Sequence, residues 1–201
     1  MIHWQEKSNE KSNSLIFNTV RGIHAHGDHF KPIQYIFVPL YNIYPSIYWA
    51  LLLQSLSVGA AAIVLFYVAR EFMPDENLVP AIFAFCFLLN PVVHNTLLWQ
   101  YHDLVLAYVL LLFMILFYLK DDIFKYILML ILVLCCREDM PFITIGMGLV
   151  AIVERRWKFA VGTIFLSIIW WLATAKIFMP ILNAQGYFQH KSGHSPHLLF
   201  G

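Results

Sequence analysis

The stretch SIYWALLLQSLSVGAAAIVLFYVA, residues 46–69, decides the fold class of this chain. It contains no charged side chain, begins with a serine that follows Pro45, and is followed by Arg70. A helix of this length measures about 36 Å at 1.5 Å per residue, which exceeds the roughly 30 Å of a bilayer's hydrocarbon core. Residues 46–69 therefore predict a membrane-spanning α-helix.

The composition of the whole chain agrees with a lipid environment. Of the 201 residues, 60% are hydrophobic and 12% are charged, about half the charged fraction of an ordinary soluble domain. Too few polar side chains remain to cover a surface in water. The net charge of +1 provides no basic excess for a polyphosphate backbone, so we expect no nucleic-acid partner.

Five more apolar runs predict further membrane segments, at residues 78–98, 104–119, 123–136, 140–153 and 159–182. Asn90-Pro91 interrupts the first of them, because proline removes a helical hydrogen bond. The runs 123–136 and 140–153 form either one kinked helix with three charges in its middle or two helices that meet at a turn. Charges near mid-bilayer are costly, so we expect the turn.

The predicted architecture is an all-α, polytopic transmembrane bundle of about six segments, with a short interfacial helix near residues 32–42. An outer polar segment (1–31) precedes the helical domain (32–182), and a second outer segment (183–201) follows it. No apolar segment or signal peptide precedes the polar amino terminus, so we expect a fragment that lacks its first span.

Lysines and arginines sort the connections into two sets, because basic loops stay in the cytoplasm. One set holds Arg70, Lys120, Lys125, Arg155, Arg156 and Lys158. The opposite set carries His24, His26, Asp28, His29, His102, Asp103, Glu138 and Asp139, so we expect these candidates for chemistry to face outward. The predicted location is a prokaryotic cytoplasmic membrane, with lipid as a partner.

The outer amino-terminal segment contains His24, His26, Asp28 and His29, which match the H-x-H-x-D-H pattern of metallo-β-lactamase-like hydrolases. That motif belongs to a soluble αββα sandwich, whereas a membrane helix is the next long element here, so we disfavour a hydrolase. A divalent metal held by His24 and His26 is one alternative, and solvated loop histidines are the other.

Three other outer positions are candidates for binding or catalysis. His102 and Asp103 lie where the second segment ends and the third begins, and Asp103 could equally cap the third helix. Arg137, Glu138 and Asp139 stand between apolar runs, either as an internally paired cluster or as an anion-binding arginine beside functional acids. Tyr187 follows the sixth segment, either as a substrate contact or as part of an interfacial aromatic belt.

In order and spacing, eight short motifs resemble the family of multi-pass membrane proteins called domain of unknown function 2079, over about residues 15 to 190. They are His29-Phe30-Lys31-Pro32-Ile33, Pro39-Leu40-Tyr41, Pro45-Ser46, Leu53-Gln54-Ser55, Leu89-Asn90-Pro91, Tyr101-His102-Asp103, Arg137-Glu138-Asp139 and Gly186-Tyr187-Phe188. The resemblance implies a relation to the GT-C glycosyltransferases, integral membrane enzymes that take a sugar from a polyprenyl-phosphate donor and use an acid in an outer loop.

By this resemblance, His29 matches the family's His-Phe-x-Pro segment, His102 its Phe-His position, and Glu138-Asp139 its Lys-Glu-Asp motif with Arg137 in place of lysine. The family's aspartate-bearing segment, which precedes the first outer-loop asparagine, is not recognisable here. If that aspartate is the catalytic base, this chain lacks it and is inactive.

The leading hypothesis is a GT-C-like transferase with a polyprenyl-phosphate sugar donor. Its expected catalytic acids are Asp28, Asp103, Glu138 and Asp139, and its expected substrate-binding residues are His29, His102, Arg137 and Tyr187. Arg137 or a bound divalent metal would stabilise the departing phosphate. A transporter or channel and a non-catalytic assembly protein are the alternatives.

Overall fold

The computed structural model describes residues 17–18, 23–24, 30–44, 46, 48–98 and 104–182. Helices make up nearly all of this part of the chain, which confirms the all-α bundle. The exception is a pair of two-residue antiparallel strands, β1 (Phe17–Asn18) and β2 (Ile23–His24), with Phe17 opposite His24.

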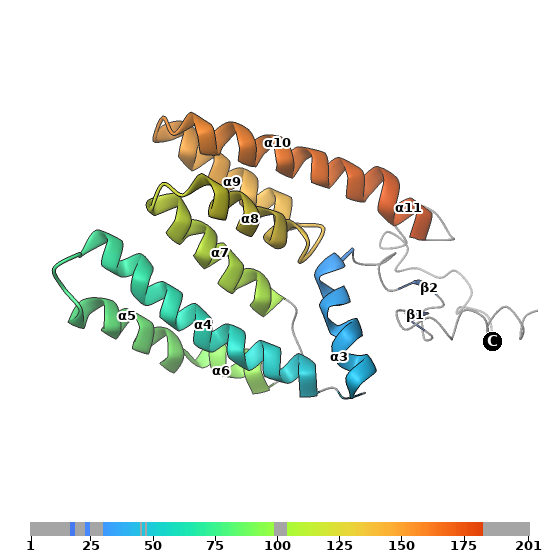
Figure 1. Cartoon of the computed structure of the whole chain (residues 1–201), viewed down its shortest axis with the longest axis horizontal. Coiled ribbons are helices and arrows are strands. Elements are labelled where there is room, and N and C mark those ends of the chain that lie inside the picture. Colours follow the sequence, from blue (N-terminus) through green and yellow to red (C-terminus); the bar gives the residue numbers. More distant parts are fainter. Residues whose placement is uncertain are drawn as a thin grey trace, which may run out of the picture.

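The helices run back and forth between two ends of the bundle (Figure 1). In chain order they are η1 (Pro32–Ile36), α3 (Phe37–Ile43), α4 (Tyr48–Phe72), α5 (Leu78–Leu89), α6 (Pro91–Leu98), α7 (Leu104–Leu119), α8 (Ile123–Leu134), α9 (Met140–Val153), α10 (Trp157–Ala173), η2 (Thr174–Phe178) and α11 (Met179–Leu182). We call the end with connections 73–77, 120–122 and 154–156 the basic end. The end with residues 135–139 is the turn end.

Two helical stretches are long and apolar enough to cross a membrane, Tyr48–Phe72 and Trp157–Ile181, each of 25 residues. Leu78–Leu89 and Pro91–Leu98 become a third if the pair, bent by 44°, counts as one span. Helices α7, α8 and α9 have 16, 12 and 14 residues, or about 24, 18 and 21 Å. Two or three spans are therefore supported by length, and the predicted six are not confirmed.

Several local predictions are confirmed. Asn90 ends α5 with extended backbone, and its side-chain oxygen accepts a hydrogen bond from the Val92 amide at 2.9 Å, which starts α6 after the predicted break. Residues 123–153 form two helices joined by a turn, as preferred over one kinked helix. The short helix predicted near 32–42 is present as η1 and α3.

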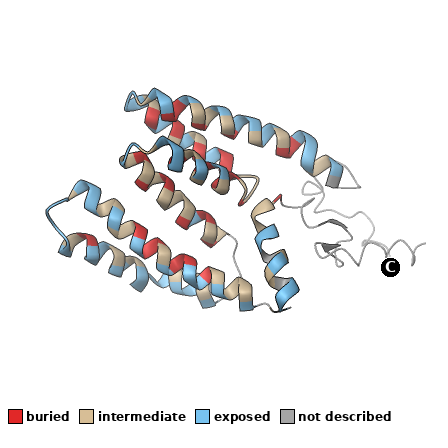
Figure 2. Ribbon diagram, in the orientation of Figure 1, coloured by how far each residue is buried: buried red, intermediate tan, exposed pale blue. Residues whose placement is uncertain are grey.

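The core lies where α7, α8, α9 and α10 meet, as the buried faces in Figure 2 show. The aromatic rings of Tyr118, Tyr126 and Phe159 pack edge to face or tilted there, with centroids 4.9 to 6.0 Å apart. Helix α9 packs extensively on α10, and α4 packs on α5 and α7. The bundle is therefore held by helix pairs that are neighbours in sequence, or nearly so.

Buried hydroxyls in this core bond to one another between helices. The Tyr126 and Thr163 hydroxyls lie 2.7 Å apart, and so do the Thr144 and Ser167 hydroxyls. Thr144, Thr163 and Ser167 have no exposed surface. In an apolar medium such hydrogen bonds link helices, because no water is present to hydrogen-bond an unpaired hydroxyl.

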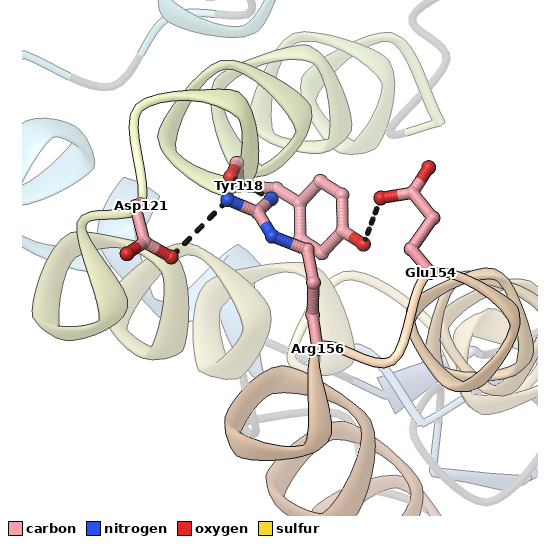
Figure 3. A network of polar contacts seen from close by, with 4 residues as sticks. All are labelled: Tyr118, Asp121, Glu154 and Arg156. Carbon is pink, nitrogen blue, oxygen red and sulfur yellow. Dashed lines mark hydrogen bonds and ion pairs between the residues drawn. The ribbon is translucent and has the colours of Figure 1, made fainter.

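At the basic end, Arg156 joins the two loops that close the bundle (Figure 3). Its guanidinium donates to the Tyr118 carbonyl at 2.5 Å and to an Asp121 carboxylate oxygen at 3.2 Å. It also lies over the Tyr118 ring, 4.3 Å from its centroid. The Tyr118 hydroxyl donates to Glu154 at 2.6 Å. These hydrogen bonds and the stacked guanidinium link the two loops to each other, so we assign the network a structural role.

Candidate functional site

The turn between α8 and α9 is built from three charged residues between two apolar helices. Asp139 occupies the N-cap position of α9, yet its side chain makes no capping hydrogen bond. The second helical residue, Pro141, has no amide hydrogen to donate, and the Phe142 amide bonds to the Asp139 main-chain oxygen at 3.1 Å. The Asp139 carboxylate is therefore not used to hold the helix.

Arg137 pairs with both acids of the turn. Its Nε lies 3.3 Å from Asp139 Oδ1 and 3.9 Å from Glu138 Oε1. The shorter contact has the distance of an ion pair, but its angles do not make a hydrogen bond, so both atoms remain without a hydrogen-bond partner in the described structure. The side chains of Arg137, Glu138 and Asp139 are 27%, 21% and 45% exposed. The cluster is thus partly buried and incompletely satisfied.

Residues 30–33 tie this turn to the last long helix. The Ile33 amide donates to the Cys135 carbonyl at 3.0 Å. Three residues earlier, the buried Phe30 ring stacks on Phe178 at 4.8 Å and lies 6.3 Å from the Trp170 ring. The turn and the Trp170–Phe178 face are therefore held at the same end of the bundle.

Two polar atoms on that face lack hydrogen-bond partners among the described residues: Trp170 Nε1 and Thr174 Oγ1. Thr174 is 1% exposed and begins the π-helical segment η2, in which the Met179 amide bonds to the Thr174 carbonyl. Buried polar groups are normally paired, and π-helical turns are frequent at functional sites. Neither residue was predicted as functional from the sequence. The available signal was the spacing of hydroxyls at 163, 167 and 174, which share one helical face.

The structure describes only part of the predicted site. Arg137, Glu138 and Asp139 lie together in the turn. His24 is described in its backbone alone, as part of β2. His26, Asp28, His29, His102, Asp103 and Tyr187 lie outside the described residues.

The described flanks of these segments do reach the turn end. Leu104, which follows Asp103 in the chain, packs against the buried cluster that contains Cys136 and Met140. Phe30, which follows His29, packs as described above. Whether the histidines and aspartates themselves meet the turn stays a prediction.

No group of three histidine, cysteine, aspartate or glutamate side chains within the described residues could hold a metal ion. This does not test the predicted His24 and His26 ligands, whose side chains are not described. The three cysteines, Cys86, Cys135 and Cys136, form no disulfide.

A family model described as "Predicted membrane protein (DUF2079)" matches residues 7–198. Comparisons with curated proteins and with solved structures gave no match. The apolar helices agree with this description of an integral membrane protein. Because the match covers almost the whole chain, the protein belongs to the DUF2079 family of predicted membrane proteins.

Proposed function

We propose that this protein is part of a membrane-bound glycosyltransferase that uses a polyprenyl-phosphate sugar at the outer membrane face. The observation that carries the proposal is the Arg137-Glu138-Asp139 turn, where an arginine and two carboxylates are partly buried at one end of an apolar bundle. Charged groups inside a membrane protein are expensive and mark functional sites by default.

The chemistry requires a base for an acceptor hydroxyl and a cation for the leaving phosphate. Glu138 or Asp139 takes the proton as the acceptor oxygen forms its bond to the anomeric carbon of the sugar. The bond between that carbon and the phosphate oxygen breaks, and the polyprenyl phosphate leaves with the electron pair. The Arg137 guanidinium stabilises the negative charge of the departing phosphate. Asp28 and Asp103 remain alternative bases.

The turn's geometry supports these roles in two ways. The Asp139 carboxylate makes no capping bond, so it is available for a proton or a hydroxyl. The Arg137 Nε has an ion-pair neighbour but no hydrogen-bond partner in the described structure, so it can donate to a ligand. In this proposal the turn end faces the exterior of a prokaryotic cytoplasmic membrane, since the opposite end holds Arg70, Lys120, Arg155 and Arg156.

The test is sugar transfer from a radiolabelled polyprenyl-phosphate sugar by the full-length protein in proteoliposomes. Loss of the general base should lower transfer at least about 100-fold in Glu138→Gln or Asp139→Asn. Glu154→Gln is the matched control, because it removes an acid at the basic end and should leave transfer unchanged. No transfer by the wild type, or unaltered transfer in both turn variants, would overturn the proposal.

Transport is the second candidate, favoured by the polar positions 156, 163, 167 and 174 along the last long helix and its N-cap. Thr163 and Ser167, however, are fully buried and bonded across helices, which favours a packing role. Ion or sugar flux into proteoliposomes, lost in Thr163→Val and Ser167→Ala, would support transport. Absence of flux would leave the hydroxyls as interhelical links.

A further inference from the structure

We propose that Trp170 and Thr174 complete a subsite at the turn end that binds a neutral, hydroxyl-rich group such as a sugar ring. Neither residue was indicated by any motif. The biological role of this subsite rests on the proposed function. Binding of a sugar at Trp170 and Thr174 is a separate claim, which can be tested without measuring transfer.

The register of α9 on α10 brings the two residues to the level of the turn. The Thr144 and Ser167 hydroxyls lie 2.7 Å apart, and a methyl group added to Gly148 would meet Ile164 at 2.6 Å. In this antiparallel pair the two residue numbers therefore add up to 311 or 312. Met140, the first residue of α9, lies one turn before Thr144, so the same register sets it opposite residues 171–172, between Trp170 and Thr174 in the chain.

The segment 30–33 gives an independent constraint on the same placement. Ile33 bonds to Cys135, two residues before Arg137. Phe30 contacts Trp170 and Phe178, which lie four residues to either side of Thr174 on one helical face. Both the turn and the face that carries Thr174 thus border a segment only four residues long.

The position of Thr174 along the membrane-spanning stretch determines how much free energy an unpaired hydroxyl costs there. Thr174 lies seven residues before Ile181, the end of the predicted span, or about 10 Å inside it. The Thr174 hydroxyl is 1% exposed and has no hydrogen-bond partner among the described residues, whereas buried hydroxyls are normally paired. This buried hydroxyl points to a ligand independently of the charged turn.

The unpaired atoms define the chemistry of that ligand. Arg137 Nε and Trp170 Nε1 donate, Asp139 Oδ1 accepts, and Thr174 Oγ1 can do either. An ionised phosphate only accepts, so it can pair with Arg137 but cannot donate to the aspartate. Sugar hydroxyls both donate and accept, and they match the complete set.

The experiment uses the full-length protein in lipid nanodiscs and follows the thermal unfolding midpoint. Three probes are compared: methyl β-D-glucopyranoside as a free sugar, octyl β-D-glucopyranoside as a lipid-linked one, and the octyl ether of tetraethylene glycol as a tail without ring hydroxyls. We expect a rise of about 3–6 °C at tenfold the dissociation constant with at least one glucoside, and none with the ether. The responding arm identifies the source as soluble or lipid-linked.

Matched variants separate binding from folding. Thr174→Val keeps the side chain's volume and should weaken glucoside binding about 3–10-fold, as should Trp170→Phe, whereas Thr174→Ser should restore it. Thr144→Val removes a paired hydroxyl from the same helix pair, so it should lower the midpoint without sugar but keep the sugar-dependent rise. Equal responses of wild type and Thr174→Val would show that water alone fills the space and would overturn the proposal.

The binding result stands apart from catalysis. Glucoside binding that depends on Thr174, with no sugar transfer, would refute the transferase but keep the subsite. Transfer that is lost in the turn variants, with no effect of Thr174→Val on glucoside binding, would do the opposite.

Discussion

Gly148 lies at the contact between α9 and α10, and a single methyl group added there should separate the two helices. A Cβ at Gly148 would lie 2.6 Å from Ile164 Cγ1 and 3.3 Å from Ile164 Cδ1, and it would be 3.6 Å from the Ala160 carbonyl oxygen. Cγ1 is close to the main chain, so the side chain cannot simply swing away. Overpacking of this kind costs about 1–3 kcal/mol.

Gly146 provides the matched control, two residues away in the same helix. A Cβ at that position meets nothing within 4 Å. Alanine gains about 0.5–1 kcal/mol over glycine in a helix, and this term is common to both sites. The free energy of unfolding of Gly148→Ala should therefore fall below that of Gly146→Ala by about 1–3 kcal/mol, the overpacking contribution alone.

The assay is reversible unfolding in mixed micelles with increasing denaturing detergent. Ile164→Ala removes both clashing atoms, so the Gly148→Ala, Ile164→Ala double variant should be more stable than the sum of the single effects predicts. If Gly148→Ala is as stable as Gly146→Ala, the tight contact and the register derived from it are wrong. That result would also remove one support for the level assigned to Thr174.

Two further predictions concern the basic end. Arg156→Met should lower the free energy of unfolding by about 1–2 kcal/mol, because it removes the hydrogen bonds to Tyr118 and Asp121. The control Arg155→Met should change the free energy of unfolding by no more than about 0.5 kcal/mol, and equal effects of the two variants in the same assay would contradict this role of Arg156. The hydrogen bonds from Lys125 lower the pKa of the Asp122 carboxyl in the folded protein. The ionised carboxylate therefore stabilises the fold at pH values above its unfolded pKa of about 3.9, and this contribution is lost as the pH falls through the lower pKa of the folded state. The difference in unfolding midpoint between wild type and Asp122→Asn should shrink on acidification from pH ~6 to ~2.5, and a pH-independent difference would refute the role of the ion pair.

The apolar runs predicted the positions of the helices well, because each run is bounded by a charge, a proline or a short polar segment. The break at Asn90-Pro91 and the turn at 137–139 follow from proline chemistry and from the cost of buried charge. The number of spans did not follow, because apolarity shows that a segment avoids water but not that it reaches both membrane surfaces. Thr174 escaped notice because a hydroxyl in an apolar helix normally bonds its own backbone or a neighbouring helix.

The short helices that fail the length test also account for the position of the charged turn. Helix α8 starts at the basic end, where α9 ends and α10 starts. Helices α8 and α9 measure about 18 and 21 Å, whereas the stretch Trp157–Ile181 measures about 38 Å. Their turn therefore stops well short of the end of the long helix, near the level of Trp170. Two full-length spans would have carried Arg137, Glu138 and Asp139 out to water, where paired surface charges contribute little. Recessed in the bundle, the same three side chains are partly desolvated, which is the setting that the proposed chemistry needs.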